Sequence, residues 1–277
     1  MESIAALPMY DWPERREEVD GEWAVIRDHL RVNGIKAPDG LVRRNGDMPA
    51  VPGGIRDAAG KVIAPDPASL LPDDLDLATL WRHPALVFGQ TCWGPMESTG
   101  LADHVAVLGQ PDYDGIEGGN GPFYSSALVM RLTDVPPETH VAPRTDGKPV
   151  LPIDLLRGRR LAYNSLESMS GLLALHHDLE TSWLGLDLFA ERIETGSHRG
   201  SIRAVAEGRA DVAAIDARSW QLARGFELAS RRLAVVGWTG LRRGLPFIVA
   251  RGLAPLWTNI AGDILGSRSR SRIGNDR

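Results

Sequence analysis

The 277-residue chain has a single cysteine, Cys92, and no long hydrophobic run. One cysteine excludes an internal disulfide bond, and a free cysteine usually behaves as a small buried hydrophobic residue. Because no apolar stretch reaches about 18 residues, we expect no membrane-spanning helix and no insertion into a membrane. The net charge of −5 argues against a nucleic-acid-binding protein, which usually carries a basic face.

The sequence also lacks the motifs of nucleotide, metal and covalent chemistry. It contains no P-loop, no dinucleotide-binding GxGxxG between a strand and a helix, no metal-spaced set of Cys and His, and no nucleophile elbow. His176 and His177 are neighbours on a predicted helix and point about 100° apart, so they do not readily share a metal. We therefore predict no cofactor, no metal and no catalytic residue, which favours binding over turnover.

The N-terminus has no signal-peptide pattern. Met1-Glu2-Ser3 leads directly into Ile4 to Met9, without a basic segment or a long apolar run. As written, the chain is expected in the cytoplasm, unless it is a mature or mis-started form of an exported protein.

Strand-like and helix-like segments alternate along the chain, and the composition, with 43% hydrophobic and 24% charged residues, is that of a globular protein. Strands are expected at 4–9, 85–89, 104–108, 124–132, 161–164, 212–215, 232–237 and 247–250. Helices are expected at 13–31, 75–81, 172–179, 202–207, 217–229 and 254–265. This alternation predicts an α/β protein with a mostly parallel sheet. The tail from Ser267 to Arg277 alternates Ser and Arg and is expected to be disordered.

Hydroxyl groups before the helix at 172–179 indicate an anion-binding loop. Ser165, Ser168 and Ser170 lie in this loop, and Gly171 allows a close approach of the backbone. Because a helix N-terminus carries unpaired N–H groups and a partial positive charge, it stabilises an oxyanion. The alternative is that Ser168 or Ser170 only caps the helix.

Two further polar residues have comparable positions. His198 precedes the next predicted helix, where its imidazole can donate to an oxyanion, and more strongly when protonated; alternatively it is a surface or capping residue. Asp216 ends a strand, which is where α/β proteins bind ligands, and it can accept from a hydroxyl or an ammonium group. Its alternative role is to cap the helix that follows.

Residues at the ends of other strands can complete a pocket. Tyr10 and Trp12 follow the first strand, and Tyr124 begins a later one; each can wall a pocket or pack in the core. Gln90 and Thr91 also follow a strand and can donate hydrogen bonds.

At these positions the chain resembles the PhnD-like substrate-binding proteins of phosphate, phosphite and phosphonate ABC transporters. The resemblance covers about residues 4–255, and its matching segments are 89–92, 123–126, 164–171, 196–198, 211–216 and 244–247. It implies a type 2 periplasmic-binding-protein fold, in which two α/β lobes are joined by two crossing strands with a ligand cleft between them. Lobe 1 would contain residues 1–122 and 244–277, and lobe 2 residues 123–243.

The resemblance also implies roles for the candidate residues. The loop from Ser165 to Gly171 and His198 would hold the oxyanion, and Asp216, Tyr124 and the edge formed by Tyr10 and Trp12 would face the rest of the ligand. Gln90 and Thr91 would contribute from lobe 1. The serine loop is longer than the usual hydroxyl cluster of the family, and its Glu167 is expected to point to solvent.

The expected function is therefore that of a solute-binding protein that closes by a hinge on a small anion, with an ABC permease as partner and the periplasm as its family location. It needs no cofactor and binds no nucleic acid. Two alternatives stay open: a cytoplasmic enzyme of cofactor or small-molecule metabolism on the same fold, with His198 and Asp216 as acid–base candidates, and an effector-binding sensor.

Overall fold

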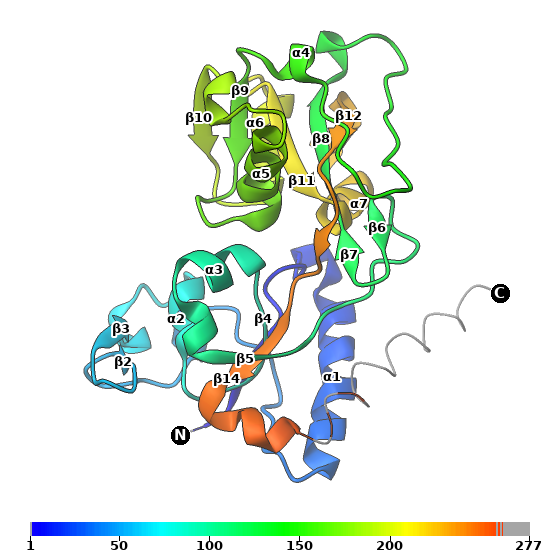
Figure 1. Cartoon of the computed structure of the whole chain (residues 1–277). Helices are drawn as coiled ribbons and strands as arrows, with labels where there is room; N and C mark the ends of the chain where they lie inside the picture. The colour runs from blue at the N-terminus through cyan, green and yellow to red at the C-terminus, as the bar shows by residue number, and fades with distance from the viewer. Residues whose placement is uncertain (1, 259, 261, 263–277) are drawn as a thin grey trace, which may run out of the picture. The chain divides into compact units, whose positions relative to one another are not determined.

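A computed structural model of the chain describes residues 2–258, 260 and 262. By its internal contacts the chain forms two units: unit 1 consists of Met1–Pro111 and Leu245–Arg277, and unit 2 of Asp112–Gly244 (Figure 1). The chain therefore passes between the units twice, at 111/112 and at 244/245.

The first passage lies earlier than the expected boundary at 122/123, because residues before 122 pair within unit 2. Strand β6 (Gly119–Asn120) pairs with β7 (Phe123–Tyr124), and β7 pairs with β13 (Arg242–Arg243) in a small antiparallel sheet. The ring of Tyr113 stacks on that of Tyr124 at a centroid distance of 5.3 Å. The predicted disordered tail, 267–277, lies outside the described residues.

The main sheet of unit 1 has the strand order β1 (Ile4–Ala6), β4 (Leu86–Gln90), β14 (Phe247–Ala250), β5 (Val105–Gly109). Strands β1 and β4 are parallel, and β14 runs antiparallel to both of its neighbours. Helix α1 (Arg16–Val32) buries Val19, Trp23, Ile26 and Leu30, the apolar positions of the predicted helix, against this sheet. Its Trp23 ring stacks on Phe88 of β4 at 6.0 Å.

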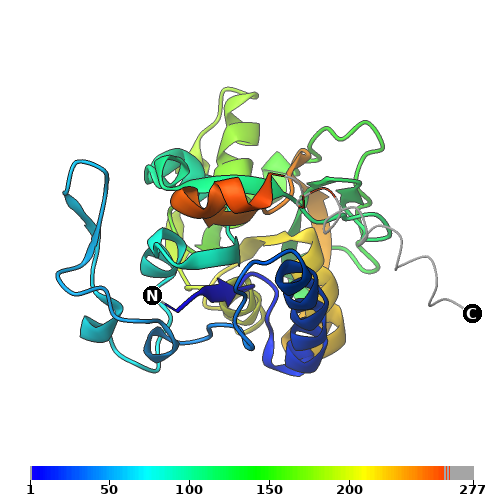
Figure 2. The ribbon, with the colours of Figure 1, turned by 90° about the horizontal axis from the view of Figure 1, so that it is seen from below.

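The remaining elements of unit 1 are short. They include α2 (Leu77–Arg82), α3 (Trp93–Ser98) and the hairpin of β2 (Ile55–Arg56) and β3 (Val62–Ala64). Figure 2 shows this hairpin projecting from the rest of unit 1. The last predicted helix, 254–265, overlaps a 3-10 helix, Arg251–Trp257, and part of it lies outside the described residues.

The main sheet of unit 2 has the order β10 (Glu191–Glu194), β9 (Arg160–Tyr163), β11 (Val212–Asp216), β8 (Ser126–Arg131), β12 (Leu233–Trp238). Strands β10, β9 and β11 are parallel, and β8 runs antiparallel to β11 and β12. Each main sheet thus has one strand of opposite direction, β14 or β8. Strand β14 follows the passage at 244/245, and β8 is the first strand of the unit 2 main sheet after the passage at 111/112. The other strands of each main sheet run in one direction, as in the mostly parallel sheet that the sequence predicts.

Helices of unit 2 cover this sheet. They are α4 (Ile153–Leu156), a π-helical turn (Met169–Leu173) that continues into α5 (Ala174–Glu180), α6 (His198–Ala206) and α7 (Ala217–Phe226). Helix α6 begins at 198, earlier than the predicted 202, and β10 is a strand that the sequence pattern does not indicate.

A buried carboxylate ties three strands of unit 2 together. The side chain of Asp211 accepts hydrogen bonds from the Arg160 backbone N–H at 3.0 Å, from the Arg160 guanidinium at 2.8 Å and from the Arg131 guanidinium at 2.8 Å. These contacts, with the Arg160 bond as the largest cause, hold the pKa of Asp211 well below its ordinary value. Asp211 therefore stays ionised and fixes the start of β11 against β8 and β9.

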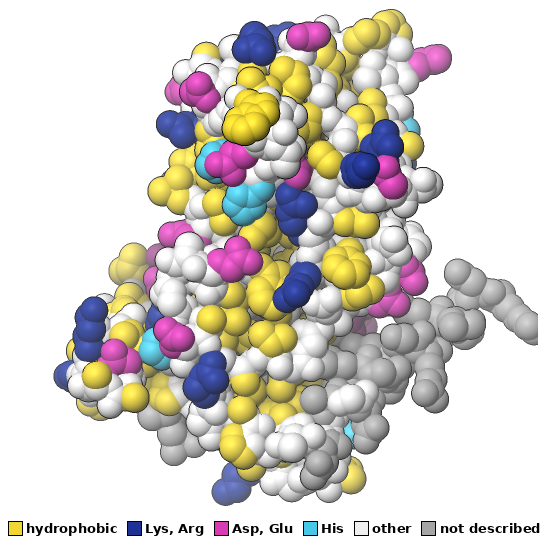
Figure 3. Space-filling model, in the orientation of Figure 1, with side chains coloured by type: hydrophobic (Ala, Val, Ile, Leu, Met, Phe, Trp, Pro, Cys, Tyr) yellow, Lys and Arg dark blue, Asp and Glu magenta, His cyan; other side chains and the backbone are white. Residues whose placement is uncertain are grey.

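Charged side chains of both signs lie among one another on the face drawn in Figure 3. No wide basic surface of the kind that binds nucleic acid is seen there among the described residues.

Candidate functional site

The carboxyl ends of the parallel strands in unit 2 bring the predicted anion site together. Glu194 lies opposite Tyr163, so β9 and β10 end side by side, and β11 lies on the other side of β9. The antiparallel pairing of Asp216 with Ser126 places the beginning of β8 at the same edge. Loops that leave a sheet at one such edge are the usual ligand-binding positions of α/β proteins.

The loop after β9 ends in a capped helix. The Ser168 hydroxyl accepts a hydrogen bond from the Gly171 N–H at 3.0 Å, and the Ser165 carbonyl accepts one from the Ser168 N–H at 3.1 Å. Ser168 therefore has the capping role that the sequence allows. Glu167 is exposed, as expected. The first turn is π-helical, because the Leu173 N–H donates to the Ser168 carbonyl; such turns are frequent at functional sites.

Gly171 has no room for a side chain. A Cβ atom added to it would lie 2.1 Å from Asn164 Oδ1 and 2.9 Å from Ser168 Oγ. The backbone of the π-turn thus lies directly against Asn164, the residue that follows β9, an approach that only glycine permits.

Ser170 and His198 are in direct contact. The Ser170 hydroxyl and His198 Nε2 are 2.8 Å apart, and Ser170 is buried. His198 begins α6, whose N-terminus is capped by the Ser197 hydroxyl, an acceptor for the Gly200 N–H at 3.0 Å. Two helix N-termini are therefore joined by one hydrogen bond between a hydroxyl and an imidazole. Both residues are predicted site residues.

Burial lowers the pKa of His198 to about 4, although the backbone carbonyl of Ala214 acts in the opposite direction. The residue as a whole is partly exposed, but the Nδ1 atom of its imidazole is inaccessible to solvent. No hydrogen bond of normal geometry reaches Nδ1 from the described residues. The imidazole is therefore neutral near pH 7, so the site depends on neutral donors and helix termini rather than on a cationic histidine.

Asp216 is almost fully buried, and its carboxylate accepts a hydrogen bond from the Ser219 N–H at 2.8 Å. It caps α7, which is the alternative role that the sequence allows. Tyr124 is also buried, stacked on Tyr113 within the small sheet. A ligand contact for either residue stays a prediction.

Two polar residues that the sequence does not single out also lie at this edge. Asn164 Oδ1 and Ser126 Oγ are buried and have no hydrogen-bond partner among the described residues. Because buried polar atoms are normally paired, these two atoms are candidates for contact with a bound ligand or water. Their position next to strand ends is the signal that points to them: Asn164 follows β9 and Ser126 begins β8.

The remaining predicted residues belong to unit 1 and lie at the carboxyl end of its parallel strands. Gln90 ends β4, and Thr91 follows it fully buried, with no partner for its hydroxyl within the described chain. Tyr10 is buried and Trp12 is half-buried after β1. The predicted set is therefore divided between the two units.

Within residues 2–258, 260 and 262, no three His, Cys, Asp or Glu side chains are grouped in a way that could hold a metal ion. None of the helices described there has the length and apolar character needed to cross a membrane.

Comparisons with solved structures show the fold. PhnD1 from Prochlorococcus marinus, in complex with methylphosphonate, matches with a TM-score of 0.59 at 15% identity, over 96% of this chain and 83% of that one. A binding-protein component of a phosphonate ABC transporter from Pseudomonas aeruginosa matches with a TM-score of 0.53 at 14% identity, over 99% and 75%. A Xanthomonas citri protein bound to chloride matches with a TM-score of 0.56 at 13% identity, over 99% and 85%.

No curated protein matches the sequence. The structural matches are periplasmic binding proteins, so the chain has the two-lobed type 2 fold that the resemblance implies. The family model of the phosphonate substrate-binding proteins of ABC transporters matches residues 119–259, half of the chain. Members of that family are periplasmic proteins that bind solutes, so the enzyme and sensor alternatives are not favoured. The chain belongs to the periplasmic phosphonate substrate-binding protein family of ABC transporters.

Proposed function

We propose that this protein binds a small phosphonate or a similar tetrahedral oxyanion at the carboxyl edge of the unit 2 sheet and presents it to an ABC permease. The contact between Ser170 and His198 is the observation that carries the proposal, because it brings two helix N-termini to one point. Helix N-termini bind phosphate-like groups through their N–H groups and their partial positive charge. Methylphosphonate, the ligand of the matching PhnD1, has this chemistry.

The neutral state of His198 gives Ser170 a defined role. If Nε2 carries the proton, it donates to the Ser170 oxygen and leaves the hydroxyl hydrogen for an oxygen of the ligand. The unpartnered Asn164 Oδ1 then suits a protonated oxygen, because a carbonyl oxygen accepts and does not donate. The Ser170 hydroxyl as donor and Asn164 Oδ1 as acceptor together fit an oxyanion that has both unprotonated and protonated oxygens.

The other predicted residues are proposed to recognise the substituent on phosphorus. Asp216 and Tyr124 would do so in unit 2. For Gln90, Thr91, Tyr10 and Trp12 in unit 1, a ligand contact stays what the family resemblance predicts. The buried, unpartnered hydroxyl of Thr91 supports its role as a donor. Its family supports a periplasmic location and a role beside an ABC permease.

Titration calorimetry with methylphosphonate, phosphate, phosphite, ethanesulfonate and succinate tests the proposal. We expect the phosphorus oxyanions to bind. The double variant Ser170→Ala/His198→Ala should weaken binding by tenfold or more, because hydrogen bonds to a charged group contribute about 1.5–3 kcal/mol each.

The matched control is His177→Ala/Ser182→Ala, which removes an exposed serine and an exposed histidine from the same unit. Its affinity should equal that of the unaltered protein. Equal affinity for the Ser170/His198 double variant and this control would show that the anion binds elsewhere.

A further inference from the structure

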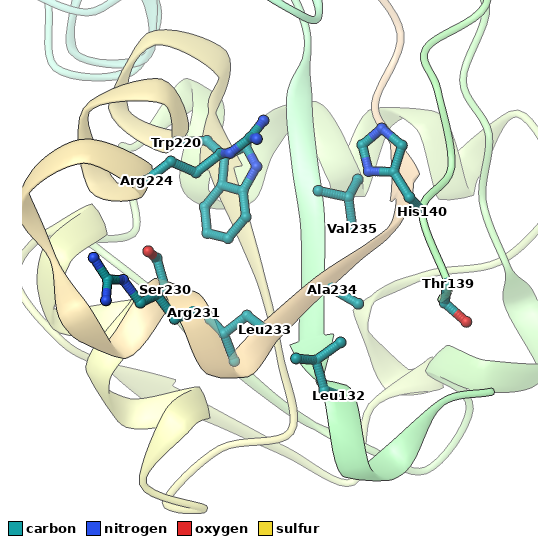
Figure 4. A pocket seen from close by; sticks show the side chains of 10 residues that line it. All are labelled: Leu132, Thr139, His140, Trp220, Arg224, Ser230, Arg231, Leu233, Ala234 and Val235. Carbon is teal, nitrogen blue, oxygen red and sulfur yellow. The ribbon is translucent and has the colours of Figure 1, made fainter. Parts of the chain in front are cut away.

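A groove on unit 2 is lined by no residue of the proposed anion site. It is bordered by α7, by β12 and by the loop before Val141, and its volume is about 410 Å³. Figure 4 shows Trp220 and Arg224 on α7, Val235 on β12 and His140 on the loop around it. An adjoining hollow of about 500 Å³ shares Trp220 and Arg224, and we call the two together the Trp220 groove. Both volumes lie within the ~300–1,000 Å³ typical of small-molecule sites.

The floor of the Trp220 groove is apolar. Trp220, Leu233 and Val235 line it and are 5%, 7% and 3% exposed. Leu132, at 44% exposure, adds an apolar edge. An indole ring beside aliphatic side chains offers a face on which the flat or extended body of an organic molecule can pack.

The loop that walls the groove is held in place without any ligand. The Val141 N–H donates to the Val235 carbonyl at 3.0 Å, and Trp238 Nε1 donates to the Val141 carbonyl at 2.6 Å. His140 Nε2 lies 2.8 Å from the Glu117 carboxylate. These contacts keep residues 140 and 141 against the edge of β12, so the groove is pre-formed.

A cationic group that makes no hydrogen bond to another described residue lies beside the apolar floor. The Arg224 guanidinium extends past the Trp220 ring toward His140 (Figure 4). The nearest carboxylate, that of Glu117, is 3.8 Å away, which is too long for a hydrogen bond, and it is already held by His140. Arg231, a second cation at the mouth of the groove, has no acidic partner in the described part of the chain. The two hollows are thus lined by two guanidinium groups, those of Arg224 and Arg231, and by one carboxylate, that of Glu117, and this balance of charge favours an anion.

We infer that the Trp220 groove binds an amphipathic organic anion. The aromatic or aliphatic body packs on Trp220, Leu233 and Val235. The carboxylate, sulfonate or phosphoryl head accepts hydrogen bonds from Arg224, whose planar fork matches such groups. This second ligand differs from the small oxyanion of the proposed function in needing an apolar body.

Titration calorimetry with 1-naphthalenesulfonate, in the presence of excess methylphosphonate, tests the inference on the full chain. We expect binding that Arg224→Ala weakens by tenfold or more and that Arg224→Glu abolishes. The matched control is Arg232→Ala, which removes an exposed arginine next to the groove that does not line it. Neutral 1-naphthalenemethanol should bind more weakly by a similar factor, because it lacks the anionic head.

Three results would overturn the inference: no binding of 1-naphthalenesulfonate, equal affinity in the Arg224 and Arg232 variants, or loss of binding in Ser170→Ala/His198→Ala. The last result would assign the sulfonate to the anion site. Failure of methylphosphonate to bind would count against the proposed function alone. The groove is tested separately, by the binding of 1-naphthalenesulfonate to the Arg224 variants.

Discussion

Replacing Gly171 by alanine tests the anion site at a position that has no room for a side chain. The new Cβ would lie 2.1 Å from Asn164 Oδ1 and 2.9 Å from Ser168 Oγ, closer than non-bonded atoms can approach. The Asn164 side chain must turn away, and the Ser168 hydroxyl must leave the position from which it accepts the Gly171 N–H. The substitution therefore disturbs the π-turn and the helix cap together.

The expected cost follows from these two contacts. Forcing extra volume into a packed site costs about 1–3 kcal/mol, and losing a helix cap costs about 1 kcal/mol. Alanine recovers up to about 1 kcal/mol through its higher helix propensity. We expect Gly171→Ala to lower the free energy of unfolding by about 1–3 kcal/mol, measured by urea denaturation and circular dichroism. Its affinity for methylphosphonate should fall together with stability.

Gly225→Ala is the matched control. Gly225 lies in α7 of the same unit, and a Cβ atom there meets no heavy atom within 4 Å. This control should be as stable as the unaltered protein or more stable by up to about 1 kcal/mol. If Gly171→Ala behaves like Gly225→Ala in both stability and affinity, the close approach of the π-turn to Asn164 has no role in the site.

Two further predictions concern stability. Burial lowers the pKa of His198 to about 4 from 6.5, so the unfolded chain binds more protons between these pH values and stability should fall as the pH drops from 6.5 to about 4. Melting temperatures of His198→Asn across that range should fall less steeply than those of the unaltered protein; parallel slopes would contradict the burial of a neutral imidazole. Asp211→Asn removes the carboxylate that Arg131 and Arg160 share, while Asp134 still pairs with Arg131, and should cost about 1–3 kcal/mol in urea denaturation. The exposed control Asp154→Asn should cost about 0.5 kcal/mol. If both variants lose the same unfolding free energy, the ion pairs of Asp211 stabilise the protein no more than an exposed aspartate does.

The apolar elements could be predicted from the sequence because their patterns are strong. The spacing of Val19, Trp23, Ile26 and Leu30 predicts α1, and all four are buried. Strand β10 could not be predicted, because its four residues, Glu191–Glu194, are mostly exposed and charged. It is an edge strand held by backbone pairing with β9, which leaves no hydrophobic signature.

The candidate site is likewise predictable from the sequence only in part. Capping residues before helices indicate Ser168 and Asp216, and the structure shows the caps of both. The contact between Ser170 and His198 depends on the parallel pairing of β9 and β10. Because β10 carries no pattern, its register, and hence this contact, cannot be derived from residue spacing. Asn164 and Ser126 lie next to strand ends, a weak signal that many residues share, and a sequence does not reveal that their buried polar atoms have no hydrogen-bond partner among the described residues.

A crystal structure with methylphosphonate tests the central claim most directly. The account predicts that the phosphonate group lies at the N-termini of the π-turn at Met169 and of α6, with an oxygen within hydrogen-bonding distance of the Ser170 hydroxyl. Density for the ligand elsewhere, with the Ser170–His198 contact unchanged and no ligand beside it, would contradict the account.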